Sequence, residues 1–277
     1  MNTREDKFSS SMVQTPPSGI RKFFEMLIGH DDVISLSVGE PDFPTPWCIR
    51  EEAFYHLEKG HTSYTSNWGL LELREEISKY MQKYNMHYNP QKEILITVGA
   101  SEGVDASLRA ILNPGDEIIV CQPCYVNYVP LARLCEVNVV PIDTSVNGFY
   151  PTAEQIEKAV TPKTKAVMIC SPNNPTGTMI PKEELEKIAE IVKKHQIWVI
   201  SDEIYCELAY DGAEHVSIGS FPGMKDYTII LNGFSKSFAM TGWRIGYIAA
   251  PAELLAQIVK LHGYNTICAP IFSQYAA

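Results

Sequence analysis

The residues best suited to chemistry lie in one stretch, Asn232 to Gly246, which reads N-G-F-S-K-S-F-A-M-T-G-W-R-I-G. Lys236 stands between two serines and is followed by apolar residues 238–240, which indicates that it enters an apolar interior. Burial disfavours the ammonium form, lowers the pKa of a lysine and leaves a nucleophilic amine. Eight residues later, Arg244 offers a planar fork suited to a phosphate. An amine that can form a Schiff base, near such an arginine, suggests a site for pyridoxal phosphate, although a loop with a solvated lysine would read similarly.

The elements that must position these residues follow an alternating pattern. Short apolar runs predict strands at residues 94–98, 117–121, 137–141, 165–169 and 197–201, with a further strand at 228–230 leading into the Lys236 stretch. Helical patterns occur at about 102–112, 125–134, 152–160 and 181–195, and earlier at about 46–59 and 70–84. This alternation predicts a three-layer α/β/α fold with a mostly parallel sheet and helices on both faces. Such sheets bind ligands at the carboxyl ends of their strands.

The first two strand ends could supply a phosphate site and an aromatic face. Residues 99–103, G-A-S-E-G, form a small-residue turn that opens a helix, and free backbone N–H groups there can bind phosphate, with Ser101 adding a hydroxyl. Glu102 is unfavourable beside an anion unless its side chain points away. Tyr125 follows the strand at 117–121 and could stack on a ligand ring, although a tyrosine in this position is more often a packing residue.

The next two strand ends could supply an amide and a carboxylate. Asn174 lies in S-P-N-N-P-T-G. The two prolines could make a rigid turn that directs the Asn174 amide toward a ligand, or the segment could be a proline-rich turn without a binding role. Asp202 emerges from the apolar strand I-W-V-I-S, and burying its charge is costly unless a cation pairs with it. A pyridoxal ring uses such a carboxylate to keep its nitrogen protonated. The coincidence of these features at one sheet edge is stronger evidence than any one of them.

Composition excludes several other classes. The net charge of −10 and the pI near 5.2 argue against a nucleic-acid or anionic-membrane surface. The N-terminus lacks the apolar core of a signal peptide, and no apolar run approaches the length of a membrane span. Seven scattered cysteines fit reduced thiols in a cytoplasmic protein. Cys121 and Cys124 have CxxC spacing without a second pair, so no metal site is predicted.

Five motifs resemble the class I/II aminotransferases of the fold-type-I pyridoxal-phosphate superfamily. They are S-V-G-E-P-D-F, S-Y-T-S-N-W-G-L-L-E-L-R, S-P-N-N-P-T-G, S-D-E-I-Y and G-F-S-K-S-F-A-M-T-G-W-R-I-G. The resemblance runs from about Ser18 to the last residue and is strongest to prokaryotic aspartate, aromatic and N-acetyl-diaminopimelate aminotransferases. It implies an enzyme that moves an amino group from an L-amino acid to a 2-oxo acid by a ping-pong Schiff-base mechanism.

The resemblance also implies roles for residues around the cofactor ring. Lys236 resembles the Schiff-base lysine, which then acts as general acid and base. Asp202 resembles the partner of the ring nitrogen, and Tyr205 and Asn174 resemble the donors to the ring oxygen. Tyr125 resembles the stacking aromatic residue, with Ile204 under the opposite ring face.

Further positions match the phosphate cup and the substrate site. The cup positions are Ala100, Ser101, Ser235 and Arg244, with Glu102 contributing through its backbone. Tyr64 matches a tyrosine that reaches the phosphate of the other subunit, which implies a homodimer with shared sites. Gly39 and Asn174 match contacts near the substrate carboxylate.

The resemblance has two departures. Gly233 stands where many members have a serine that binds the phosphate. The chain also ends at Ala277, where members continue for roughly a hundred residues that include the arginine for the substrate α-carboxylate. We therefore expect an N-terminal arm and part of the small domain at 1–45, a large cofactor-binding domain at 46–277, and a C-terminal small domain absent from this chain. Possible substitutes for that arginine are Arg21, Arg109 and His262, each more typical of a surface or capping residue.

Two other activities fit the superfamily. One is a C–S β-lyase acting on sulfur amino acids, although S-F-A-M-T-G-W-R after Lys236 fits transamination better. The other is a non-catalytic regulatory domain, which usually carries an N-terminal DNA-binding domain that 17 residues cannot supply. The sequence does not specify the amino donor or acceptor.

Overall fold

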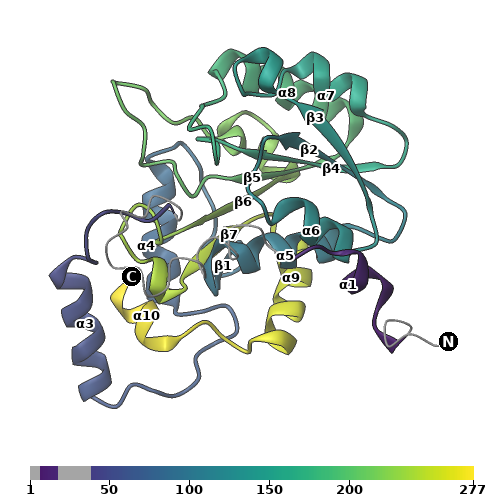
Figure 1. Ribbon diagram of the computed structural model, residues 1–277. Helices are drawn as coiled ribbons and strands as arrows, with labels where there is room; N and C mark the ends of the chain where they lie inside the picture. Colours follow the sequence, from purple (N-terminus) through teal and green to yellow (C-terminus); the bar gives the residue numbers. More distant parts are fainter. Residues whose placement is uncertain (1–6, 18–38) are drawn as a thin grey trace, which may run out of the picture.

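The centre of the computed structural model, which describes residues 7–17 and 39–277, is a seven-stranded sheet (Figure 1). Its order is β1-β7-β6-β5-β4-β2-β3. The strands are β1 (Ile94–Thr97), β2 (Glu117–Gln122), β3 (Asn138–Asp143), β4 (Thr164–Cys170), β5 (Trp198–Asp202), β6 (Thr228–Gly233) and β7 (Gly246–Ala249). Only β7 runs antiparallel to its neighbours β1 and β6, and the other pairs are parallel. The predicted mostly parallel sheet is confirmed.

Helices cover both faces of this sheet. One face packs against α5 (Gly99–Ile111), α6 (Tyr128–Leu134) and α9 (Ala252–Asn265), and the other packs against α7 (Ala153–Ala159) and α8 (Lys182–His195) (Figure 1). Consecutive strand residues alternate between these faces. Ile118 and Val120 of β2 belong to the α5 side, whereas Ile119 between them belongs to the α8 side. A strand buried on both faces must be apolar throughout, which is why β2, β4 and β5 read as continuous apolar runs.

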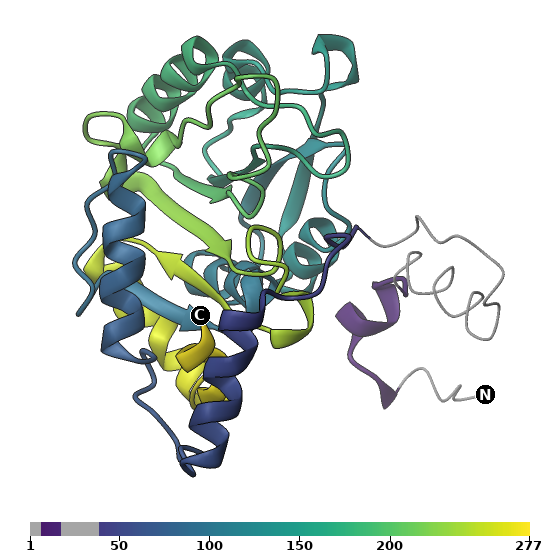
Figure 2. The ribbon, with the colours of Figure 1, turned by 90° about the vertical axis from the view of Figure 1, so that its left-hand side faces the viewer.

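A third group of helices lies beside the β1–β7 end of the sheet (Figure 2). It consists of α3 (Trp47–Glu58), α4 (Leu71–Gln82) and α10 (Ile271–Ala276). Leu73, Ile77 and Met81 recur along one face of α4 and pack with Ile94 and Ile96 of β1. A short helix, α1 (Ser10–Gln14), precedes them, and 3₁₀ turns occur at Ser145–Asn147, Ile218–Ser220, Met224–Tyr227 and Thr241–Trp243.

The sequence-based prediction differs from the structure in a few places. The helix predicted from 125 starts only at Tyr128, and β7, α9 and α10 were not predicted. The sequence Thr45-Pro46 predicts a cap followed by a first-turn proline, but the N-cap of α3 is Pro46, and the Thr45 hydroxyl donates to the carbonyl of Ala239. The sequence also predicts a helix after Ser18 and a strand at 33–38, and both lie outside the described residues.

The described residues contain neither a membrane-spanning helix nor a metal-binding cluster. None of the helices in 7–17 and 39–277 combines the length and apolar character needed to cross a bilayer. Within the same ranges, no three His, Cys, Asp or Glu side chains cluster in a way that could hold a metal ion.

Candidate active site

The chemically suited residues lie where strands end at one edge of the sheet. Because β7 is antiparallel to both β1 and β6, strands β1 and β6 run the same way as β5, β4 and β2. Their carboxyl ends therefore share an edge. Asp202 is the last residue of β5, and Lys236 follows β6. Asn174 follows β4, Tyr125 follows β2, and α5 begins directly after β1.

Asp202 is a buried carboxylate without a cationic partner. Its side chain is 4% exposed, accepts hydrogen bonds from the Tyr128 hydroxyl at 2.6 Å and the Ile204 backbone N–H at 3.2 Å, and forms no ion pair with any residue that the structure describes. Burial raises the pKa of Asp202 to about 6, and the hydrogen bond from Tyr128 opposes that rise. A carboxylate in this state fits a ligand that brings its own cation, such as the protonated ring nitrogen of pyridoxal phosphate.

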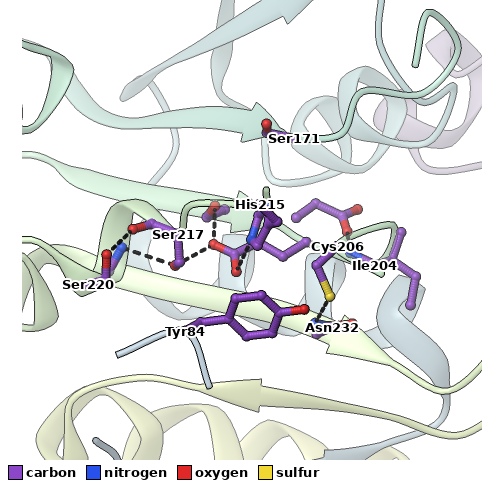
Figure 3. Close-up of polar contacts among 12 residues, drawn as sticks. Tyr84, Ser171, Ile204, Cys206, His215, Ser217, Ser220 and Asn232 are labelled. Carbon is purple, nitrogen blue, oxygen red and sulfur yellow. Dashed lines mark hydrogen bonds and ion pairs between the residues drawn. The ribbon is translucent and has the colours of Figure 1, made fainter. Parts of the chain in front are cut away.

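A polar cluster holds the segment that follows Asp202 (Figure 3). The side chains of Glu203 and His215 are each 2% exposed. Glu203 accepts hydrogen bonds from Ser201 Oγ at 2.9 Å and Ser217 Oγ at 2.7 Å, and its Oε2 lies 3.1 Å from His215 Nε2. The cluster fixes the end of β5 from the side opposite Asp202. Sequence reasoning missed it, although a glutamate directly after a buried strand was a signal.

We expect His215→Leu to lower the free energy of unfolding by about 3 kcal/mol, because it leaves a buried carboxylate with only two hydroxyl donors. Urea unfolding measures the difference. His195→Leu is the matched control, since His195 contacts Glu157 at a half-exposed site and should change the free energy by less than about 1 kcal/mol. Equal effects of the two substitutions would contradict this account of the cluster.

Lys236 lies in the turn after β6, partly buried. Its Nζ donates a hydrogen bond to the carbonyl of Gly39 at 2.5 Å and lies 5.9 Å from the centre of the Tyr205 ring. Burial lowers the pKa of Lys236; the charge of Glu40 opposes this shift and that of Arg244 adds to it. The amine is therefore more available as a nucleophile and base than that of a surface lysine.

Tyr205 and Asn174 form a pair beside Asp202. Asn174 Nδ2 donates to the Tyr205 hydroxyl at 3.2 Å. Burial raises the pKa of Tyr205 to about 12, so the phenol keeps its proton at neutral pH and can donate it to an acceptor. Tyr125 packs edge-on against Tyr128, with ring centres 5.5 Å apart, and Tyr128 in turn holds Asp202.

The start of α5 meets the guanidinium of Arg244. Gly99 has a φ of +73°, which L side chains rarely adopt, and it lies so close to the guanidinium that a Cβ there would be 2.5 Å from Arg244 Nη2. Arg244 Nη1 donates a hydrogen bond to the carbonyl of Thr241 at 3.0 Å, which fixes the orientation of the guanidinium group. Ala100 and Ser101 follow in the first turn of α5. Free N–H groups at a helix N-terminus and an arginine fork together favour a phosphate.

Backbone packing explains why residue 233 is a glycine. It pairs with Gly246 across β6 and β7, and a Cβ at Gly233 would lie 2.9 Å from the Gly246 Cα and 3.0 Å from the Ile245 carbonyl oxygen. A serine at this position would therefore require the two strands to separate.

Some predicted residues lie elsewhere or are turned away. Tyr64, in the loop between α3 and α4, is 80% exposed. The Glu102 side chain points toward α9, where it meets His262. Of the possible substitutes for the carboxylate-binding arginine, Arg109 pairs with Asp105 on α5 and Arg21 lies outside the described residues. Of the two roles expected for His262, surface or capping, the surface role is excluded because the residue is 1% exposed.

Sequence comparison identifies the family. A profile described as "Aminotransferase class I and II" matches residues 31–277. The chain is 51% identical over 271 residues to a putative aminotransferase, YugH, of Bacillus subtilis, covering 97% of this chain and 70% of that protein. It is 47% identical to a probable N-acetyl-LL-diaminopimelate aminotransferase of the same organism, covering 94% of this chain and 66% of the relative. The chain belongs to the class I and II aminotransferases.

Solved aminotransferase structures show the same fold. The aspartate aminotransferase of Thermus thermophilus with maleate superimposes with a TM-score of 0.92 at 37% identity, covering 97% of this chain and 71% of that one. An aromatic aminotransferase from Pyrococcus horikoshii OT3 gives a TM-score of 0.86 at 43% identity, covering 93% and 69%. The predicted family, fold and use of pyridoxal phosphate are thereby confirmed. The β-lyase and regulatory alternatives are not favoured, since the matched relatives are named as aminotransferases.

Proposed function

We propose that the site around Lys236 transfers an amino group from an L-amino acid to a 2-oxo acid, and that the protein works in the cytoplasm. Family membership supports the reaction, and relatives named as aspartate, aromatic and N-acetyl-LL-diaminopimelate aminotransferases support amino acids as substrates. The observation that carries the proposal is Asp202, a buried carboxylate without a cation, at the same sheet edge as Lys236.

The chain offers a contact for each part of the cofactor. Asp202 would accept a hydrogen bond from the protonated ring nitrogen, and Tyr205 and Asn174 would donate to the ring oxygen. Tyr125 and Ile204 would contact the two ring faces. The phosphate would bind Ala100, Ser101, Ser235 and Arg244, with the Glu102 backbone. When bound, pyridoxal phosphate supplies an electron-accepting ring that stabilises negative charge at the α-carbon of the amino acid.

The residues of the chain perform the proton transfers and the positioning. Lys236 Nζ would accept the proton from the substrate α-carbon, which its lowered pKa favours at neutral pH, and would then donate it to the cofactor rather than back to that carbon. The Gly39 carbonyl holds Nζ in place and marks the side from which the substrate carboxylate would approach. Asp202 would stay ionised and hold the proton on the ring nitrogen.

A half-reaction screen tests the proposal. The cofactor-loaded protein is mixed with single L-amino acids, conversion of the bound cofactor from its aldehyde to its amine form is followed by absorbance, and the 2-oxo acid is identified by mass spectrometry. At least one amino acid should give both signals. Release of pyruvate from cystathionine without any 2-oxo acid from the other amino acids would instead indicate a β-lyase.

Tyr64 supports a further proposal, a homodimer with shared sites. Its side chain is 80% exposed and its loop lies far in sequence from the other phosphate contacts. We expect it to reach the phosphate bound by a second copy of the chain. The chain would then complete each site only as a dimer.

Complementation between two inactive variants tests the shared site. Mixing Tyr64→Phe chains with Lys236→Ala chains gives heterodimers in which one site carries both lesions and the other carries neither. Activity should rise well above that of either parent, as measured by steady-state turnover of the mixture. If the heterodimer is shown to form by mass spectrometry and activity does not rise, Tyr64 does not act across the interface.

A further inference from the structure

The carboxylate of Glu102 sits in the first turn of α5, beside the proposed phosphate cup. Its Oε2 accepts a hydrogen bond from the backbone N–H of Val98, the residue before the helix. Its Oε1 lies 2.6 Å from His262 Nδ1 and accepts from Thr266 Oγ1 at 3.3 Å. Val98 directly precedes α5, and His262 and Thr266 lie at the end of α9. These three contacts hold the Glu102 side chain in one orientation.

A fixed negative charge at this place is a disadvantage for phosphate binding. The same helix start carries the free N–H groups and the Arg244 fork that would bind the phosphate. A carboxylate near a helix N-terminus stabilises the helix when no other anion is present. It repels a second anion that binds at the same place. The Glu102 side chain is only 18% exposed, so water screens this repulsion poorly.

His262 contacts this carboxylate from the end of α9. Its side chain is completely buried on α9, and Glu102 is its only ion-pair partner in the part of the chain that the structure describes. Its Nε2 is also buried and has no hydrogen-bond partner among those residues. Among the described residues, the only polar contact of this buried imidazole is therefore to the Glu102 carboxylate.

We propose that His262 is a positioning residue for the cofactor phosphate: the contact of its Nδ1 with Oε1 holds the Glu102 carboxylate turned away from the cup. The inference rests on the proposed function, since it requires that the start of α5 binds a phosphate. It predicts that His262 matters only for ligands that carry a phosphate, and only while residue 102 is charged.

Two ligands that differ only in the phosphate test the inference. Pyridoxamine phosphate and pyridoxamine have the same ring and, as amines, form no covalent bond with Lys236. Calorimetric titration of the cofactor-free full chain gives both dissociation constants. His262→Leu should raise the constant for pyridoxamine phosphate about tenfold and change that for pyridoxamine less than about twofold. Adding Glu102→Gln to His262→Leu should restore the first constant to within about threefold of the unaltered chain.

Arg244→Gln separates failure of the inference from failure of the proposed function. This substitution should weaken pyridoxamine phosphate much more than pyridoxamine. If it does not, the cup itself is misplaced and the proposed function fails. If it does, but His262→Leu weakens both ligands equally or the double variant shows no rescue, His262 is a packing residue and only the inference is overturned.

A single substitution keeps the inference testable if His262→Leu does not fold. Glu102→Gln alone removes the charge and keeps an acceptor for the Val98 N–H, so it should fold and bind pyridoxamine phosphate at least as tightly as the unaltered chain. A tenfold weaker binding by folded Glu102→Gln would overturn the proposal, because the carboxylate would then help the phosphate rather than oppose it.

Discussion

Lys236→Ala should lower kcat for transamination by about 10⁴-fold or more, because it removes both the nucleophile and the group that moves the α-proton. The variant should still bind the cofactor, since Arg244 and the start of α5 lie outside the change. Steady-state kinetics with the donor found in the half-reaction screen measure the loss. Equilibrium dialysis against pyridoxal phosphate checks that binding persists.

Lys225→Ala is the matched control for Lys236→Ala. Lys225 Nζ bonds to the His87 carbonyl and to Glu93, near the opposite end of β6, so its loss should leave kcat within about threefold. In the unaltered chain, borohydride reduction followed by peptide mapping should place the cofactor label on Lys236. A label on Lys225 or Lys260 would contradict the assignment.

Strand periodicity was sufficient to predict the sheet and the edge at which the candidate site lies. Asp202 stands out because it is a carboxylate at the end of an apolar run, and Asn174 because it lies in the polar turn that follows another such run. Strand β7 was missed because it begins at a glycine inside the motif around Lys236 and is followed at once by Ala250 and Pro251, so it does not stand apart as an apolar run. Its antiparallel placement between β1 and β6 depends on packing, which a local pattern does not contain.

Contacts distant in sequence explain what else was missed. Glu203 and His215 are 12 residues apart, and Glu102 and His262 are 160 apart, so no spacing rule connects either pair. The steric reason for Gly233 likewise depends on Gly246 across the sheet. A sequence pattern shows which helix or strand carries a residue. It does not show which helices and strands pack together, and these pairs depend on that packing.

Asp202→Asn should lower kcat by on the order of a thousandfold, because an amide does not hold the proton on the ring nitrogen. The same change should stabilise the cofactor-free protein. The pKa of Asp202 is about 6 in the folded chain against an ordinary value of 3.8. The folded state therefore holds this proton more strongly than the unfolded state, and the associated stability is present below pH 3.8 and lost as the pH rises to 6.

The stability difference between Asp202→Asn and the unaltered chain should thus depend on pH. Asparagine is uncharged throughout, so the variant should gain up to about 3 kcal/mol relative to the unaltered chain above pH 6 and almost nothing below pH 4. Urea unfolding of the cofactor-free proteins at pH 4, 5, 6 and 7 measures the trend. Asp143→Asn is the control, because its effect on the free energy of unfolding should have the opposite sign. Hydrogen bonds from Ser145 lower the pKa of that exposed carboxyl.

Saturating pyridoxal phosphate should reverse the order of stability at pH 7. The ring nitrogen supplies the cation that Asp202 lacks, so the cofactor should stabilise the unaltered chain more than the Asp202→Asn variant. This reversal is expected if the Asp202 carboxylate binds the cofactor, and it is not expected if Asp202 only packs against its neighbours. If Asp202→Asn is less stable than the unaltered chain at pH 7 without cofactor, or turns over at a near-normal rate, Asp202 is not the residue that holds the ring nitrogen.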